Sequence, residues 1–91
     1  MTAVAQLAER IIKEQELIIG PLAWREAKKV KGLTIKTDGD VRLLGDAKKV
    51  LGDLVKQYEK MFGPASREVC REAVRGLTSK AKDDELPEVL K

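Results

Sequence analysis

Histidine is absent from this chain, and cysteine and the aromatic residues are nearly so. Without histidine, the chain lacks the commonest general acid–base group and the commonest protein ligand of transition metals. It also lacks a glycine-rich phosphate-binding loop. We therefore expect a protein that is not an enzyme, with no catalytic residue, no cofactor and no metal site.

The single cysteine, Cys70, has no partner for an internal disulfide, as is typical of proteins from a reducing compartment. Its neighbours are apolar, so we expect it to serve as a small hydrophobic side chain of the core. No apolar run approaches the roughly 18 residues that cross a bilayer, and the first residues do not have the pattern of a signal peptide. We expect a cytoplasmic location and no membrane contact.

The composition is that of an amphipathic helical protein. Of the 91 residues, 43% are hydrophobic and 36% are charged, so the chain has enough apolar surface to fold. This length corresponds to one small domain, with a stability of about 5 to 10 kcal/mol. The periodicity predicts a mainly α fold with one β-hairpin, which belongs to the α+β class.

The chain repeats itself after a shift of 43 positions. At this shift the apolar positions of the first helix, and the Gly20–Pro21 pair that follows, fall on apolar positions and on Gly63–Pro64. The aligned apolar residues are Val4, Leu7, Ala8, Ile11, Ile12, Ile18 and Ile19 with Ala47, Val50, Leu51, Leu54, Val55, Met61 and Phe62. Internal duplication and coincidental reuse of a helix–Gly–Pro–helix corner both remain open. Duplication predicts a pseudo-two-fold packing in which Ile11, Ile12, Ile18 and Ile19 face Leu54, Val55, Met61 and Phe62.

The predicted order of elements is ααββαα. Residues 1–82 are expected to form one compact domain, with a helix pair over 3–32, a hairpin over 33–44 and a second helix pair over 46–79. Glycine followed by proline is typical of a helix end and a new helix start, although helices that continue with a kink through Pro21 and Pro64 remain open. Residues 83–91 form an acidic tail that either frays or docks as a strand.

Between the helix pairs the apolar period changes from 3.6 to 2, which predicts the hairpin. A three-residue loop over 37–39, with Gly39 at positive φ, places all the apolar residues on one face. In this register Ile35 pairs with Val41 and Leu33 with Leu43, and Lys36 lies opposite Asp40. Asp46 then caps the third helix.

Six residues are candidates for contact with a partner: Trp24, Arg67, Arg71, Arg75, Leu86 and Val89. Trp24 either plugs the end of the core or stands exposed as a contact residue. The three arginines form an i, i+4, i+8 row on the outer face of the last helix. The acidic tail is in a position to cover this basic surface.

We expect a non-enzymatic protein–protein interaction or regulatory module with an unidentified protein partner. We also expect a homodimer, because a small core leaves the apolar face of the hairpin incompletely covered. One alternative is a small basic nucleic-acid-binding protein, although Glu26, Glu68 and Glu72 interrupt the basic stripe and no aromatic residues interleave to stack on bases. A second alternative is a sensor domain that holds a small apolar ligand between its halves.

Overall fold

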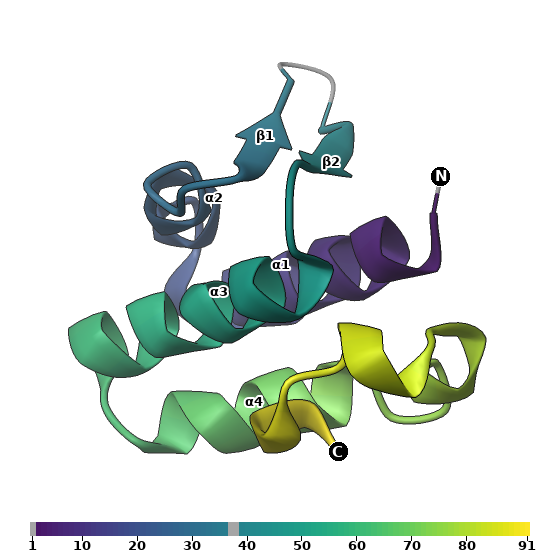
Figure 1. Ribbon diagram of the computed structural model, residues 1–91. Coiled ribbons are helices and arrows are strands. Elements are labelled where there is room, and N and C mark those ends of the chain that lie inside the picture. The colour runs from purple at the N-terminus through teal and green to yellow at the C-terminus, as the bar shows by residue number, and fades with distance from the viewer. Residues whose placement is uncertain (1, 37–38) are drawn as a thin grey trace.

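The computed structural model describes residues 2–36 and 39–91 and is mainly helical, with a two-stranded antiparallel hairpin (Figure 1). The elements within these residues are α1 (Ala3–Ile19), α2 (Leu22–Ala27), β1 (Leu33–Ile35), β2 (Val41–Leu43), α3 (Ala47–Phe62), α4 (Ala65–Ala73) and the 3-10 helices η1 (Thr78–Lys80), η2 (Asp83–Glu85) and η3 (Glu88–Leu90). The predicted combination of helices with a β-hairpin is confirmed. Among the described helices, none is both long and apolar enough to cross a membrane.

The elements form layers around α1 and α3 (Figure 1). These two helices run in the same direction, and α4 returns beneath them and contacts both. The hairpin and α2 cover the opposite side, where β2 contacts α1. As a result, the turn from α1 to α2 and the turn from α3 to α4 lie at the same end of the molecule.

Both turns break the helix instead of kinking it. Gly20 and Gly63 have φ of 69° and 96°, and their N–H groups donate to the carbonyls of the last helical turn. Pro21 and Pro64 follow with helical φ of −58° and −60° at the N-caps of α2 and α4. Proline is tolerated there because a helix start leaves its first N–H groups unpaired.

The second helix is shorter than the sequence predicts. It ends at Ala27 and not near Gly32, and Lys29 and Val30 continue it only as turns with bonds to the third preceding carbonyl. Ala23, Ala27 and Val30 still face the core, as the pattern indicated. The prediction and the structure therefore differ only after Ala27, where the α-helical hydrogen bonds give way to turns.

The hairpin has the predicted register, with Leu33 paired to Leu43 and Ile35 to Val41. Gly39 has φ of 85°, and the Lys36 N–H donates to the Asp40 carbonyl at 3.0 Å. The Asp40 carboxylate also forms an ion pair with Arg42 at 3.0 Å. The other two predicted loop residues, 37 and 38, lie outside the described residues.

Gly32 precedes the hairpin at a position that only glycine fits. Its φ is 89°, and an added Cβ would lie 2.7 Å from the Val50 side chain and 2.9 Å from the Leu44 carbonyl oxygen. Its own carbonyl accepts from the Leu44 N–H at 2.7 Å. This close approach joins the base of the hairpin to the first turns of α3.

α3 begins as predicted at Asp46, whose carboxylate accepts from the N–H groups of Lys48 and Lys49 at 3.0 and 3.4 Å. The core is one continuous cluster that includes the middle turns of α1 and α3. Its members from these two helices are Val4, Leu7, Ala8, Ile11, Ile12, Val50, Leu51, Leu54, Val55 and Tyr58.

Two residues that the repeat assigned to this core are outside it. Ile18 and Met61 are 64% and 48% exposed, whereas Ile19 and Phe62 are partly buried against the core. The prediction for Ile18 and Met61 was wrong, because in the last turns of α1 and α3 only the next residues, Ile19 and Phe62, pack against the core. The chain turns away immediately afterwards, so no further turn covers these side chains.

Candidate interaction surfaces

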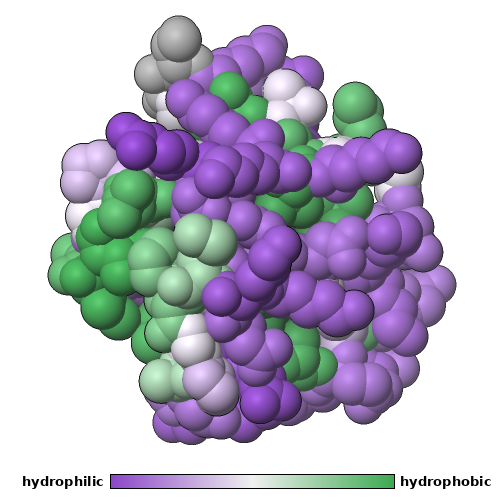
Figure 2. Space-filling view, turned by 90° about the vertical axis from the view of Figure 1, so that its left-hand side faces the viewer, coloured by the Kyte–Doolittle hydropathy of each residue, from purple (hydrophilic) through white to green (hydrophobic). Residues whose placement is uncertain are grey.

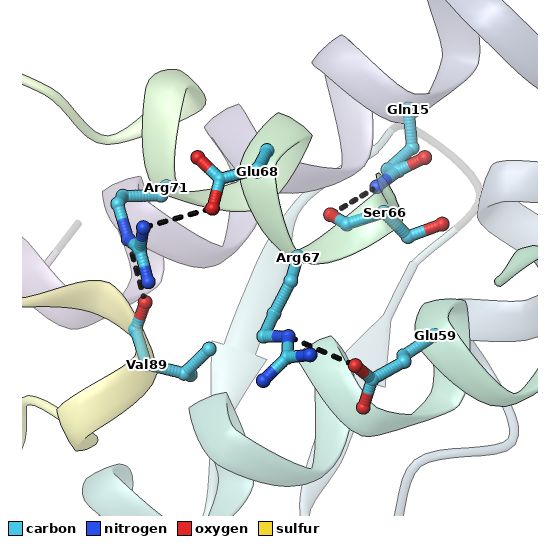
Figure 3. Close-up of polar contacts among 7 residues, drawn as sticks. All are labelled: Gln15, Glu59, Ser66, Arg67, Glu68, Arg71 and Val89. Carbon is cyan, nitrogen blue, oxygen red and sulfur yellow. Dashed lines mark hydrogen bonds and ion pairs between the residues drawn. The ribbon is translucent and has the colours of Figure 1, made fainter. Parts of the chain in front are cut away.

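Neighbouring glutamates neutralise the arginine row, and Figure 3 shows the pairs of Arg67 and Arg71. The last helix is shorter than the sequence predicts, because α4 ends at Ala73 and Arg75 lies beyond it. The ion pairs join Arg67 Nε to Glu59 Oε2 at 2.9 Å, Arg71 Nη1 to Glu68 Oε1 at 2.9 Å and Arg75 Nη2 to Glu72 Oε1 at 2.8 Å. Glu68 and Arg71 have the i, i+3 spacing that places side chains together on a helix surface, whereas Arg75 follows α4 in a turn. The row is therefore compensated charge by charge.

Arg71 also holds the C-terminal segment, since its Nε donates to the Val89 carbonyl at 3.2 Å (Figure 3). Leu86 and Leu90 are only 6% and 2% exposed and belong to the core. The tail is therefore neither frayed nor a strand, because two leucines hold it on the core as 3-10 turns. Of the two tail candidates for partner contact, Leu86 is buried and Val89 is half-buried.

The charges of the tail pair within the tail. Lys91 Nζ lies 3.2 Å from Asp83 Oδ1 and 3.4 Å from Glu88 Oε1, and the hydrogen bonds to these two carboxylates raise the pKa of Lys91. Glu85 accepts from the Lys82 N–H at 2.8 Å. The sequence predicted that the acidic tail would cover the arginines. For Asp83, Glu85 and Glu88 this prediction is wrong, because their partners are Lys91 and the Lys82 N–H.

Trp24 combines features of both interpretations made from the sequence. It is half-buried and packs against the core, and its Nε1 donates to Glu16 Oε2 at 2.8 Å. This bond joins α2 back to the last turns of α1. Trp24 thus bridges the first corner and is only half-buried.

Exposed apolar side chains lie at the end of the molecule that holds both Gly–Pro corners. Leu17 and Ile18 in the last turn of α1 are 80% and 64% exposed, Leu22 at the start of α2 is 40% exposed, and Met61 in the last turn of α3 is 48% exposed. We name these four residues the apolar end. Figure 2 looks at this end of the molecule, where apolar side chains occupy one side and hydrophilic ones the other.

One feature of the sequence indicates the apolar end: an apolar residue, Leu17, stands at a position of α1 where the helical period predicts a polar one. Leu17 lies opposite the buried face of this helix. By contrast, the apolar face of the hairpin is not a free surface. Leu33 and Val41 are 7% and 1% exposed, and Ile35 and Leu43 pack against the core.

Buried polar side chains connect the two halves of the core. Gln15 is 1% exposed, and its Nε2 donates to the Ser66 carbonyl at 3.3 Å (Figure 3) and to Cys70 Sγ at 3.5 Å. The Tyr58 hydroxyl donates to the Ala23 carbonyl at 2.6 Å. These bonds satisfy buried groups that would otherwise destabilise the fold.

Glu26 is buried on α2, where it accepts from Lys29 Nζ at 3.0 Å and from Gln57 Nε2 at 2.7 Å. These hydrogen bonds, that of Lys29 foremost, hold the pKa of Glu26 below its ordinary value.

Burial raises the pKa of the Cys70 thiol to about 11, because a buried site disfavours the charged thiolate. The Cys70 thiol therefore stays protonated near neutral pH and is a core side chain, as predicted.

No cluster of three or more potential metal ligands is found in residues 2–36 and 39–91. Comparisons with protein families, with curated proteins and with solved structures find no match to this chain.

Proposed function

We propose that this chain is a non-enzymatic protein–protein interaction module that forms a homodimer through its apolar end. The observation that supports this proposal is the exposure of Leu17, Ile18, Leu22 and Met61 at helix ends that lie together. Single exposed apolar residues are common on protein surfaces, but an exposed group of them is typical of an interaction site.

A second copy is the partner that suits this surface. An apolar surface is complementary to itself across a two-fold axis, and the same helix turns carry Glu16 and Lys60, whose opposite charges suit a polar rim. Full burial of one leucine or isoleucine side chain contributes about 1.5 to 3 kcal/mol. The four side chains of each copy are 40% to 80% exposed, so each contributes only part of this value. Association costs about 4 to 15 kcal/mol, and we therefore expect a dimer that dissociates on dilution.

The other function classes have weaker support. The arginine row is paired with glutamates, which leaves it little free charge for phosphates. A ligand sensor needs an enclosed apolar site, whereas the hollows beside β2 and between α3 and the tail are open to solvent. The reduced, buried Cys70 agrees with the cytoplasmic location that we propose.

We also infer that the ααββαα chain arose by duplication of a helix–Gly–Pro–helix unit. Gln15 and Tyr58 are 43 positions apart, as are Ala23 and Ser66. Gln15 donates to the Ser66 carbonyl, and Tyr58 donates to the Ala23 carbonyl. Each unit thus gives the other the same hydrogen bond from the same position, although the two side chains differ chemically.

A second pair of contacts follows the same shift. Glu16 accepts from Trp24 Nε1 at 2.8 Å, and Glu59 lies 2.9 Å from Arg67 Nε. These contacts extend the register of 43 beyond both prolines, where the sequence left it open. The parallel course of α1 and α3, with α2 and α4 on opposite sides of them, also suits a pseudo-two-fold axis along the helices (Figure 1).

Sedimentation equilibrium of the full chain tests the dimer. We expect a reversible dimer at high micromolar concentration, and we expect the double variant Leu17→Glu, Ile18→Glu to be monomeric. Leu44→Glu is the control for a charge placed on another exposed apolar residue, because Leu44 is 68% exposed but follows β2, away from the apolar end. A monomeric wild type, or equal effects of the two changes, would refute the proposal.

A further inference from the structure

Four lysines surround one hollow of the surface between α3 and the turn that follows α2. The residues that line it are Lys29, Val30, Lys31, Asp53, Lys56, Gln57 and Lys60. We name it the lysine hollow. All four lysines are exposed, and Asp53 is the one carboxylate of this lining.

The charge of the lysine hollow is largely uncompensated. Lys29 pairs with Glu26 at 3.0 Å, and Asp53 is itself occupied by Lys49 at 2.9 Å. Over the described part of the chain, Lys31, Lys56 and Lys60 take part in no ion pair. This is the reverse of the arginine row, where each guanidinium has a glutamate.

The second unit of the chain shows that the fold does not require these lysines. At the shift of 43, the positions equivalent to Lys29, Lys31, Lys56 and Lys60 hold Glu72, Val74, Lys13 and Leu17. The one lysine retained, Lys13, pairs with Glu9 at 3.2 Å. The other helix–Gly–Pro–helix corner therefore forms without a basic cluster. The lysines of the hollow are thus not needed to build such a corner.

We propose that the lysine hollow binds the phosphate backbone of duplex nucleic acid. Lysine ammonium groups bind phosphates as point charges, and such contacts need no base-specific geometry. No aromatic residue lines the hollow, which excludes stacking on unpaired bases there and favours a duplex over a single strand. An acidic protein segment fits less well, because Val30 is the one large apolar side chain of the lining and protein interfaces have an apolar centre.

This binding goes beyond the proposed dimer and uses none of the four residues of the apolar end, although Lys60 also lies at the rim proposed for the dimer. It predicts affinity without sequence preference and with a steep dependence on salt, because each neutralised phosphate releases counterions. The logarithmic slope on duplex DNA is about 0.9 per phosphate contact, so the four lysines together account for a slope of at most about 3.6.

The test is fluorescence anisotropy of a labelled DNA duplex with the full chain over a range of salt concentrations. One variant replaces Lys29, Lys31, Lys56 and Lys60 by glutamine. The matched control replaces Arg10, Lys13, Lys80 and Lys82 by glutamine. These four residues are also exposed, and their replacement removes the same net charge. We expect the first variant to lower the slope by about three contacts and the control to leave it within one contact of the wild type.

Three results would overturn the proposal. They are absence of binding by the wild type near physiological salt, an equal loss in both variants, and binding to phosphatidylserine vesicles or polyglutamate with none to the duplex. Circular dichroism melting of both variants establishes that they fold, which matters most for the lysine variant because Lys29→Gln removes a charged partner of the buried Glu26. The dimer is measured separately by sedimentation, so failure of one proposal does not affect the test of the other.

Discussion

The Tyr58 hydroxyl donates to the backbone carbonyl of Ala23 at 2.6 Å inside the core, and so ties α3 to the first turn of α2. Tyr58→Phe removes this donor and keeps the ring in place. We expect a loss of about 1 kcal/mol of unfolding free energy, the usual net value of a buried hydrogen bond. Urea unfolding followed by circular dichroism measures it. An unchanged or higher stability would show that the bond does not stabilise the fold.

Gly32→Ala should be much more costly than the same change at Gly45. Both glycines have positive φ, but an added Cβ meets Val50 and Leu44 at Gly32 and meets nothing within 4 Å at Gly45. The change at Gly45 therefore costs only the unfavourable φ, about 1 to 2 kcal/mol, whereas Gly32 adds overpacking of about 1 to 3 kcal/mol. Urea midpoints of the two variants compare the costs. Equal midpoints would contradict the close approach at the base of the hairpin.

Alkaline pH should destabilise the protein through Cys70. Its pKa rises from about 9 to about 11 on folding, because burial disfavours the thiolate. Between these values the unfolded chain has lost the proton that the folded chain keeps, so stability is full below about pH 9 and falls as the pH approaches 11. Burial raises the pKa of Tyr58 as well, which acts in the same direction.

The loss from Cys70 is at most about 3 kcal/mol, since one pKa unit corresponds to about 1.4 kcal/mol. Unfolding free energies measured from neutral to alkaline pH, for the wild type and for Cys70→Ala, isolate the thiol. The variant should lose less stability over this range, whatever its stability at neutral pH. An identical pH dependence of the two proteins would mean that Cys70 ionises equally in both states.

Leu90→Ala should destabilise the whole domain by about 2 to 5 kcal/mol, the usual cost of truncating a buried leucine. Leu90 is 2% exposed although it is the second-last residue of the chain. Glu88→Ala is the control from the same turn, and we expect it to change stability by less than about 0.5 kcal/mol. Thermal melts of both variants provide the comparison. A loss below this limit for Leu90→Ala would mean that the tail does not stabilise the core.

Features that depend on neighbouring residues in the chain were predictable from the sequence. The register of the hairpin follows from putting its apolar residues on one face, and the Asp46 cap and the breaks after Gly20 and Gly63 follow from local backbone chemistry. These interactions span a few residues, so the sequence contains all the participants.

Features that depend on packing between elements distant in the sequence were not predictable. Helical periodicity gives the direction of a side chain but not where the neighbouring element ends, which is why Ile18 and Met61 were assigned to the core. Burial of Gln15 and Glu26 depends on partners 51 and 31 residues away. The apolar end and the lysine hollow each combine residues from separate elements, so neither was visible as a motif.

The hydrogen bonds that the two units exchange have a consequence for a chain cut in the hairpin loop. Gln15 depends on a carbonyl of the second unit and Tyr58 on one of the first, so each fragment alone lacks partners for its buried polar groups. Neither fragment should hold its native structure in isolation, whereas an equimolar mixture should reassemble. Fragment complementation would thus be obligatory, and its concentration dependence would measure the strength of the contact between the two halves of the chain.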